Sequence, residues 1–175
     1  MAYSFDTPYA GLMPIANTDS GVTPPSSSTV IPTPPLKLGM IVKASDPTFG
    51  EGEFILLAGV ASTAVGSVVT YNTTSWTTTL APAGTNKPQP IAIAMAANTS
   101  SSTWSWYQIS GIAVAAKTSG LALASAAAVG VLTAGKIAAT ASGKEVQGAL
   151  TVAKSTTSTS VRLIMNRPHM QGRVT

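Results

Sequence analysis

Large apolar residues occupy both alternating sets of positions in residues 104–113, which read WSWYQISGIA. As a strand, this stretch places Trp104 and Trp106 on one face and Tyr107 and Ile109 on the other, because successive strand residues point to opposite faces. A strand with one solvated face would instead carry a polar residue at every second position. The pattern predicts a strand through the middle of a sandwich or barrel, or between subunits. Trp104, Trp106 and Tyr107 are therefore expected in the core or at a subunit interface.

Shorter apolar runs bounded by turn residues follow one another along residues 36–168, and they predict an all-β domain, either a compact β-sandwich or a small β-barrel. In residues 91–96, isoleucine and methionine share one face and alanines share the other. Such a strand suits a position between the core and a closely approaching sheet or subunit. The expected strands, besides the one above, are 36–43, 53–57, 66–71, 91–96, 145–153 and 160–165.

Residues 120–143 give conflicting signals. The alanine-rich run 121–129 has high helix propensity, but glycines recur at positions 120, 130, 135 and 143. This spacing favours short strands and turns. We expect strands or loops here, with one short helix at most. Pro168 is expected to end the last strand because proline lacks the backbone donor of a ladder, which leaves residues 169–175 as a basic C-terminal tail.

Residues 1–35 hold seven of the twelve prolines and form an extended N-terminal arm. Ordering an arm costs on the order of 1 kcal/mol per residue, which a lone extended segment cannot recover from itself. We expect the arm to become ordered by lying on another surface, with a disordered tail as the alternative. The large apolar residues available for such a contact are Tyr3, Phe5, Tyr9, Leu12, Met13 and Ile15.

Charge is scarce in this sequence: 9% of the residues are Asp, Glu, Lys or Arg, against roughly 25% in typical soluble domains. A weakly charged surface suits a subunit covered by neighbours better than a free monomer. The lysines are spread singly and no basic residue lies between Trp104 and Ile112, so nucleic-acid binding is not expected. The arginines near the C-terminus form either a solvated basic end or a contact with an acidic neighbour.

Three further features are not expected: disulfides or thiolate zinc sites, a signal peptide, and a membrane span. The chain has no cysteine, which excludes disulfides and thiolate zinc sites. Asp6, Pro8 and Pro14 interrupt any signal-peptide core. The alanine-rich region 112–141 carries two lysines and several glycines, which argues against a membrane span.

Candidate catalytic and ligand-binding groups are few. Residues 130–136, GVLTAGK, match the start of a phosphate-binding loop, but Ile137 stands where Ser or Thr should hold magnesium. Asp46, Glu51 and Glu53 match no calcium loop and suit a solvated hairpin. The single histidine, His169, has no cysteine partner and lies near the C-terminus. No catalytic residue, metal ligand or cofactor is predicted, and the chain is not expected to be an enzyme.

A family resemblance rests on a series of short motifs in order. Residues 106–113, WYQISGIA, resemble a strand of the small capsid cement, or head decoration, proteins of tailed bacteriophages. Ser105 replaces a common glycine, and the arm is unusually long. The other matching segments are GSVVTYN at 66–72, PIAIA at 90–94, GKI at 135–137, GKEVQGA at 143–149 and SVRLI at 160–164.

The resemblance implies a structural protein that binds the outer surface of a phage head and stabilises the capsid lattice, without catalysis. Its implied partners are the major capsid protein and further copies of itself, as a homotrimer, and its location is the virion. On this reading, Tyr3, Phe5, Tyr9, Leu12, Met13 and Ile15 are expected to contact the capsid, because large apolar residues supply most interface energy. The alternative is a receptor- or glycan-binding protein associated with the virion fibre, which would expose Trp76, Trp104 or Trp106 for stacking on sugar rings.

Overall fold

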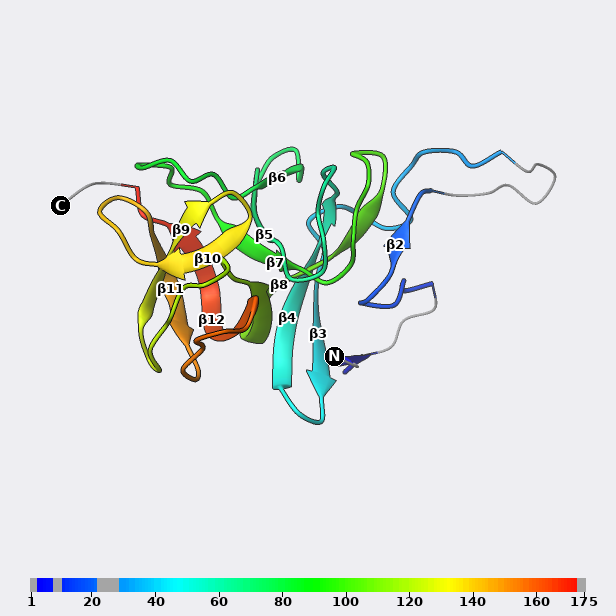
Figure 1. The fold of residues 1–175 in the computed structure, drawn as a ribbon. Helices are drawn as coiled ribbons and strands as arrows, with labels where there is room; N and C mark the ends of the chain where they lie inside the picture. The colour runs from blue at the N-terminus through cyan, green and yellow to red at the C-terminus, as the bar shows by residue number, and fades with distance from the viewer. Residues whose placement is uncertain (1–2, 8–10, 22–28, 173–175) are drawn as a thin grey trace.

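Every regular element in the described part of the chain is a β-strand (Figure 1). The structure is a computed structural model, and it describes residues 3–7, 11–21 and 29–172. The strands are β1 (Ser4–Phe5), β2 (Thr18–Asp19), β3 (Ile41–Asp46), β4 (Gly50–Ala58), β5 (Val68–Tyr71), β6 (Thr78–Leu80), β7 (Ile91–Ala94), β8 (Trp104–Ala116), β9 (Ala128–Thr133), β10 (Lys136–Ala139), β11 (Glu145–Thr151) and β12 (Ser160–Met170).

The strands form one antiparallel sheet whose main path runs β1-β3-β4-β8-β12-β11-β9-β10. A side branch, β6-β5-β7, joins β8, and β2 also pairs with β8. The two ends of the path do not pair with each other, so the sheet is not a closed barrel. The prediction of an all-β fold is confirmed, and the open sheet is consistent with a sandwich.

β8 is the strand on which the sheet converges, since it pairs with β2, β4, β7 and β12. The first half of β8 is buried on both faces. Trp104 and Trp106 belong to one apolar cluster, and Tyr107 and Ile109 belong to another. The prediction of a central strand with two apolar faces is therefore confirmed, and its aromatic residues lie in the core.

A bulge just before Gly111 lies where the pairing of β8 with β4 gives way to its pairing with β12, because Ile109 has no partner in β4. The register with β4 shifts between Glu53 and Phe54, and Gly111 has a φ of 90°. Its backbone lies so close to β4 that a Cβ atom would overlap the carbonyl oxygen of Glu51. Only glycine meets both conditions, since other residues disfavour positive φ and all carry a Cβ.

The last strand runs further than the sequence predicted. β12 continues through Pro168 to Met170, which is fully buried, so the predicted tail 169–175 is wrong in its first two residues. The register with β11 shifts at this point, where Arg167 and Gly148 both have positive φ. Pro168 lies inside this irregularity and has no ladder partner, which is why its missing N–H does not end the strand.

Residues 120–143, where helix propensity and glycine spacing gave conflicting signals, contain two strands and no helix. β9 and β10 make a hairpin that turns at Gly135 (φ 71°). In contrast, β6 was not among the expected strands, and it lies in a threonine-rich stretch. Thr78 is buried there, and its hydroxyl donates to the carbonyl oxygen of Ala58 at 2.7 Å. A polar side chain can thus be part of the core when its hydrogen bond is made internally.

The positive φ of Gly111 and its close approach to β4 predict that substitution at this position lowers stability. Gly111→Ala is expected to lower the free energy of unfolding by about 1–2 kcal/mol from positive φ and by a further 1–3 kcal/mol or so from the overlap with β4. Gly120→Ala is the matched control, since Gly120 has a φ of 72° and open space around its Cα. Urea unfolding measures both. Equal losses for the two variants would contradict the close approach at Gly111.

Candidate functional site

The described part of the N-terminal arm lies on the chain's own β domain. β1 pairs with β3, and β2 pairs with the start of β8. Met13 and Ile15 are buried, with 7% and 4% of their surfaces exposed, and they share a cluster with Phe54, Trp104 and Trp106. The surface on which this part of the arm is ordered is therefore its own domain.

Directed contacts fix the arm on one face of β8. The indole Nε1 of Trp106 donates to the carbonyl oxygen of Met13 at 2.8 Å. The ring of Phe5 meets the Trp106 ring edge-on, with centroids 5.9 Å apart. A buried indole N–H needs an acceptor, so the arm supplies both an apolar cover and the polar partner of Trp106.

Tyr3 makes a second set of contacts further along β8. Its ring packs edge-on against Phe54 with centroids 4.8 Å apart, and its hydroxyl donates to the carbonyl oxygen of Ile112 at 3.0 Å. The same hydroxyl accepts from Nε2 of Gln108 at 3.4 Å. Burial raises the pKa of Tyr3, which favours the protonated hydroxyl that this arrangement requires.

The six arm residues predicted to contact a capsid differ in how much of their surface is exposed to solvent. Tyr3, Phe5 and Leu12 are partly buried, and Met13 and Ile15 are buried against the β domain. Tyr9 lies outside the described residues. Contact with a capsid stays a prediction.

The tryptophans are not arranged as a sugar-stacking platform. Trp106 is fully buried and Trp104 is 6% exposed. Trp76 is partly buried, with its ring packed against the backbone of Gly39, where an added Cβ would lie 2.5 Å from a ring carbon. Of the three tryptophans, only the exposed part of Trp76 is available for stacking on a sugar, as the glycan-binding alternative requires.

The polar groups beside β8 form a closed network. Asn98 is 1% exposed, and its Nδ2 donates to the hydroxyls of Ser105 at 2.8 Å and Tyr107 at 3.1 Å. Its Oδ1 accepts from Thr103 at 2.8 Å. Burial raises the pKa of Tyr107, so the phenol stays protonated. These groups satisfy one another, which is typical of a structural network.

Two of the acidic residues make contacts within the fold. Asp46 Oδ1 accepts the backbone N–H groups of Thr48 at 2.8 Å and Phe49 at 3.1 Å, which fixes the turn of the β3–β4 hairpin. Glu53 forms an ion pair with Arg167, Oε2 to Nε, at 3.1 Å. Among residues 3–7, 11–21 and 29–172, no group of three or more acidic or histidine side chains is placed to hold a metal ion.

The remaining candidates from the sequence do not assemble into a site. Gly135 is the turn of the β9–β10 hairpin, and Ile137 is fully buried, so residues 130–137 are not arranged as a phosphate-binding loop. His169 is exposed on β12 between two buried neighbours. A search of the described residues for membrane-spanning helices finds none.

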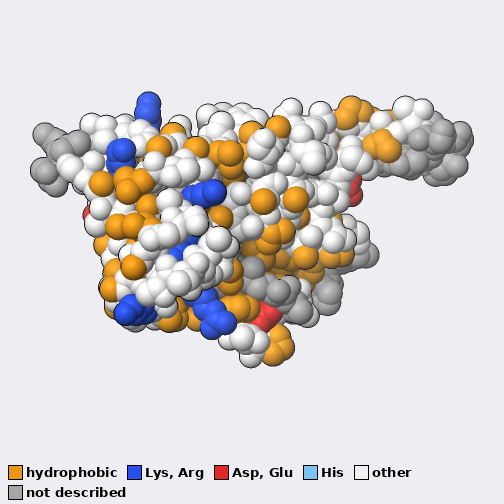
Figure 2. Space-filling view, in the orientation of Figure 1, with side chains coloured by type: hydrophobic (Ala, Val, Ile, Leu, Met, Phe, Trp, Pro, Cys, Tyr) orange, Lys and Arg blue, Asp and Glu red, His pale blue; other side chains and the backbone are white. Residues whose placement is uncertain are grey.

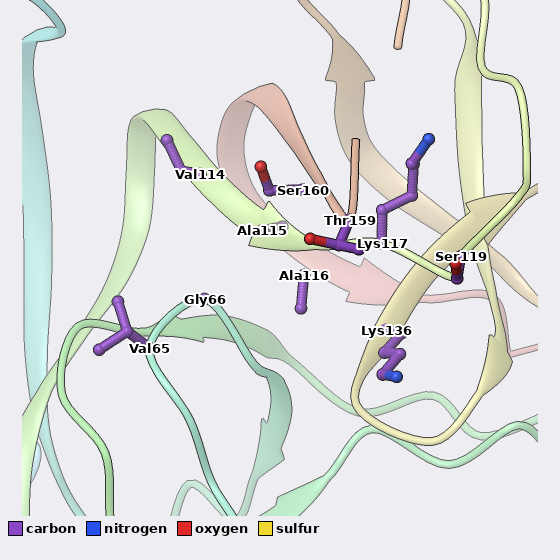
Figure 3. Close-up of a pocket in the computed structure, with 10 residues that line it drawn as sticks. All are labelled: Val65, Gly66, Val114, Ala115, Ala116, Lys117, Ser119, Lys136, Thr159 and Ser160. Atoms are coloured by element: carbon purple, nitrogen blue, oxygen red, sulfur yellow. The ribbon is translucent and has the colours of Figure 1, made fainter. Parts of the chain in front are cut away.

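One hollow lies at the end of β8, with a volume of about 340 Å³ and lysines 117 and 136 in its lining (Figure 3). Lys117 is 1% exposed, and its Nζ donates to three backbone carbonyl oxygens, of Leu121, Ser155 and Thr156. Figure 3 shows its side chain directed away from Lys136. Lys117 therefore ties two loops together and does not offer its charge to a ligand.

A more prominent feature is an apolar groove on the outer face of β8, β12 and β11. Ile112, Ile164 and Leu150 lie in register across these strands, and Ile164 and Leu150 are 52% and 45% exposed. We call these residues the apolar row. The groove beside them, the outer groove, has a volume of about 570 Å³, and its lining includes Ser110, Gly111, Gly148, Leu150, Ile164 and Met165.

The space-filling view shows no concentration of basic side chains on the face it presents (Figure 2). The lysine and arginine side chains are separated from one another by apolar and uncharged atoms, and acidic atoms are few. A nucleic-acid surface would gather basic groups along one face. The face shown is suited to contacts with uncharged or apolar partners.

Comparison with protein-family models finds no family that matches the chain, and comparison with curated proteins finds no relative. The class that the structure itself defines is an open all-β sheet with an N-terminal arm packed onto its central strand.

The packing of the arm predicts that an arm residue contributes to folding stability. Ile15→Ala is expected to lower the free energy of unfolding by about 2–4 kcal/mol, because it leaves a cavity beside Trp104 and Trp106. Urea unfolding followed by tryptophan fluorescence measures the loss. Asn17→Ala, at an exposed position two residues further along the arm, is the control. Unchanged stability in the Ile15 variant would show that the arm is not part of the core.

Proposed function

We propose that this protein is a structural virion protein that binds the outer surface of a phage head and stabilises the capsid lattice. The observation that carries the proposal is a weakly charged surface with an exposed apolar row on a sheet. Exposed apolar patches on folded proteins mark contacts with partners. The ordered series of motifs that resembles the cement proteins supports a capsid lattice, made of the major capsid protein and further copies of the chain, as the setting of these contacts.

The partners proposed are the major capsid protein and further copies of the chain, as a homotrimer. No catalytic step and no cofactor belong to the proposal. A protein that binds only the assembled lattice stabilises that lattice by mass action. Each bound copy makes disassembly less favourable, against heat and against the pressure of packaged DNA.

The arm has two roles in this proposal. Tyr3, Phe5 and Leu12 keep part of their surfaces free and can contact the capsid while the arm stays docked. Met13 and Ile15 would have to leave the core to do so, which would uncover Trp106. We therefore assign direct contact to the partly exposed residues, and assign Met13 and Ile15 to holding the arm in place.

Co-sedimentation with matched capsids that lack the protein tests this function. The full-length chain is expected to sediment with the capsids and to raise their melting temperature. The double variant Phe5→Ala and Leu12→Ala is expected to bind at least tenfold more weakly, since it removes two apolar anchors. Point variants are preferable to removal of residues 1–35, because that truncation takes Met13 and Ile15 out of the core.

The control is Thr73→Ala, at an exposed position in the loop between β5 and β6. It should bind as the unmodified chain does. Absence of the full-length chain from the capsid pellet would overturn the decoration function. Equal binding by the double variant would remove Phe5 and Leu12 from the contact and leave the function standing.

A further inference from the structure

The segment 29–35 projects from the body of the molecule on the side opposite β11 and β12 (Figure 1). We call it the lobe. It reads TVIPTPP and carries no charge. Val30 and Ile31 are 40% and 46% exposed, and they are adjacent in the chain. Burial of these two apolar side chains against a partner would be favourable.

The lobe is constrained in a way that suits binding. Pro32, Pro34 and Pro35 each fix φ, which leaves few conformations to lose on association. At its base, the backbone of Gly21 touches the carbonyl group of Ile31, so closely that a Cβ at position 21 would overlap it. Val30 and Ile31 are thus presented by a segment with little freedom.

The outer groove, lined by β11, β12 and the middle of β8, is also largely apolar. It is a hollow of about 570 Å³ beside Leu150 and Ile164, on the β11–β12 side. Gly111 and Gly148 line it without side chains, both have positive φ, and each lies at or next to a register shift of its strand. Among the described residues, Glu145 is the only charged one in the lining of the groove. A segment without charge can therefore occupy the groove without charge repulsion.

We propose that the lobe of one copy inserts Val30 and Ile31 into the outer groove of a second copy. Figure 1 shows the lobe on the opposite side of the molecule from β11 and β12, which line the groove, so the lobe and groove of one chain do not meet. The contact is therefore between copies and joins two different surfaces. Such head-to-tail contacts close into rings when the rotation between copies allows it. The inference goes beyond capsid binding, since it assigns the surfaces by which copies associate in solution.

Complementation between two variants tests this assignment. Ile31→Ser removes an apolar side chain from the lobe, and Ile164→Ser removes one from the groove. Both residues are exposed, so neither change should disturb folding. In sedimentation velocity, the unmodified chain is expected to form a discrete oligomer and each variant alone to be monomeric. An equimolar mixture should form a dimer, because one intact lobe and one intact groove remain in each mixed pair.

Val65→Ser is the control, since Val65 is 59% exposed and belongs to neither surface. It should assemble as the unmodified chain does. Three results would overturn the proposal: a monomeric unmodified chain at all concentrations, variants that still assemble, or a mixture that stays monomeric. A contact between identical surfaces would give the last result, because a mixed pair would still carry the defect.

Cross-linking gives a second measurement, helped by the absence of cysteine from the chain. A mixture of Val30→Cys and Leu150→Cys chains should form a disulfide-linked heterodimer on mild oxidation. Each variant alone should link far less, and linking of Val30→Cys to itself at the same rate would contradict a lobe-to-groove contact. No capsid is present in these experiments, so their failure and the failure of the decoration function are separate results.

Discussion

The structure depends on the burial of both faces of β8. Trp104 and Trp106 point to one side, and Tyr107 and Ile109 point to the other. Each face needs its own cover, since exposing a large aromatic side chain forfeits the free energy of its burial. Residues of β4 and of the β5–β7 strands belong to the cluster on the second face, whereas residues of the N-terminal arm, β3 and β4 belong to the cluster on the first. The arm is therefore a component of the core, and its fixed position limits which arm residues can contact a partner.

The same central strand determines the outer surface. β8 pairs with β4 along its first half and with β12 along its second, and the bulge at Ile109, just before Gly111, lies where the two pairings meet. Bending there, with the irregularity at Gly148 on β11, forms the outer groove beside the apolar row. The internal packing of the aromatic residues and the groove on the surface are thus two consequences of one bent strand.

The sequence allowed the central strand, its two apolar faces and most other strands to be predicted, because side-chain alternation is a local property. It also excluded the apparent phosphate-binding loop, since Ile137 breaks the motif. What it did not show depends on distant pairs of residues. The acceptor for Trp106 is Met13, 93 positions away, and Pro168 lies within β12 because its local pairing with β11 is interrupted at Gly148. No local pattern encodes either contact.

Hydrogen exchange of the Trp106 indole N–H, followed by NMR, tests most directly whether the arm belongs to the core. The N–H is buried and bonded to the carbonyl of Met13, so it exchanges only when the arm leaves. If the arm is part of the core, the indole should exchange as slowly as the backbone amides in the middle of β8. Rapid exchange of the indole beside protected β8 amides would show that the arm detaches on its own, which would contradict its role as a fixed cover.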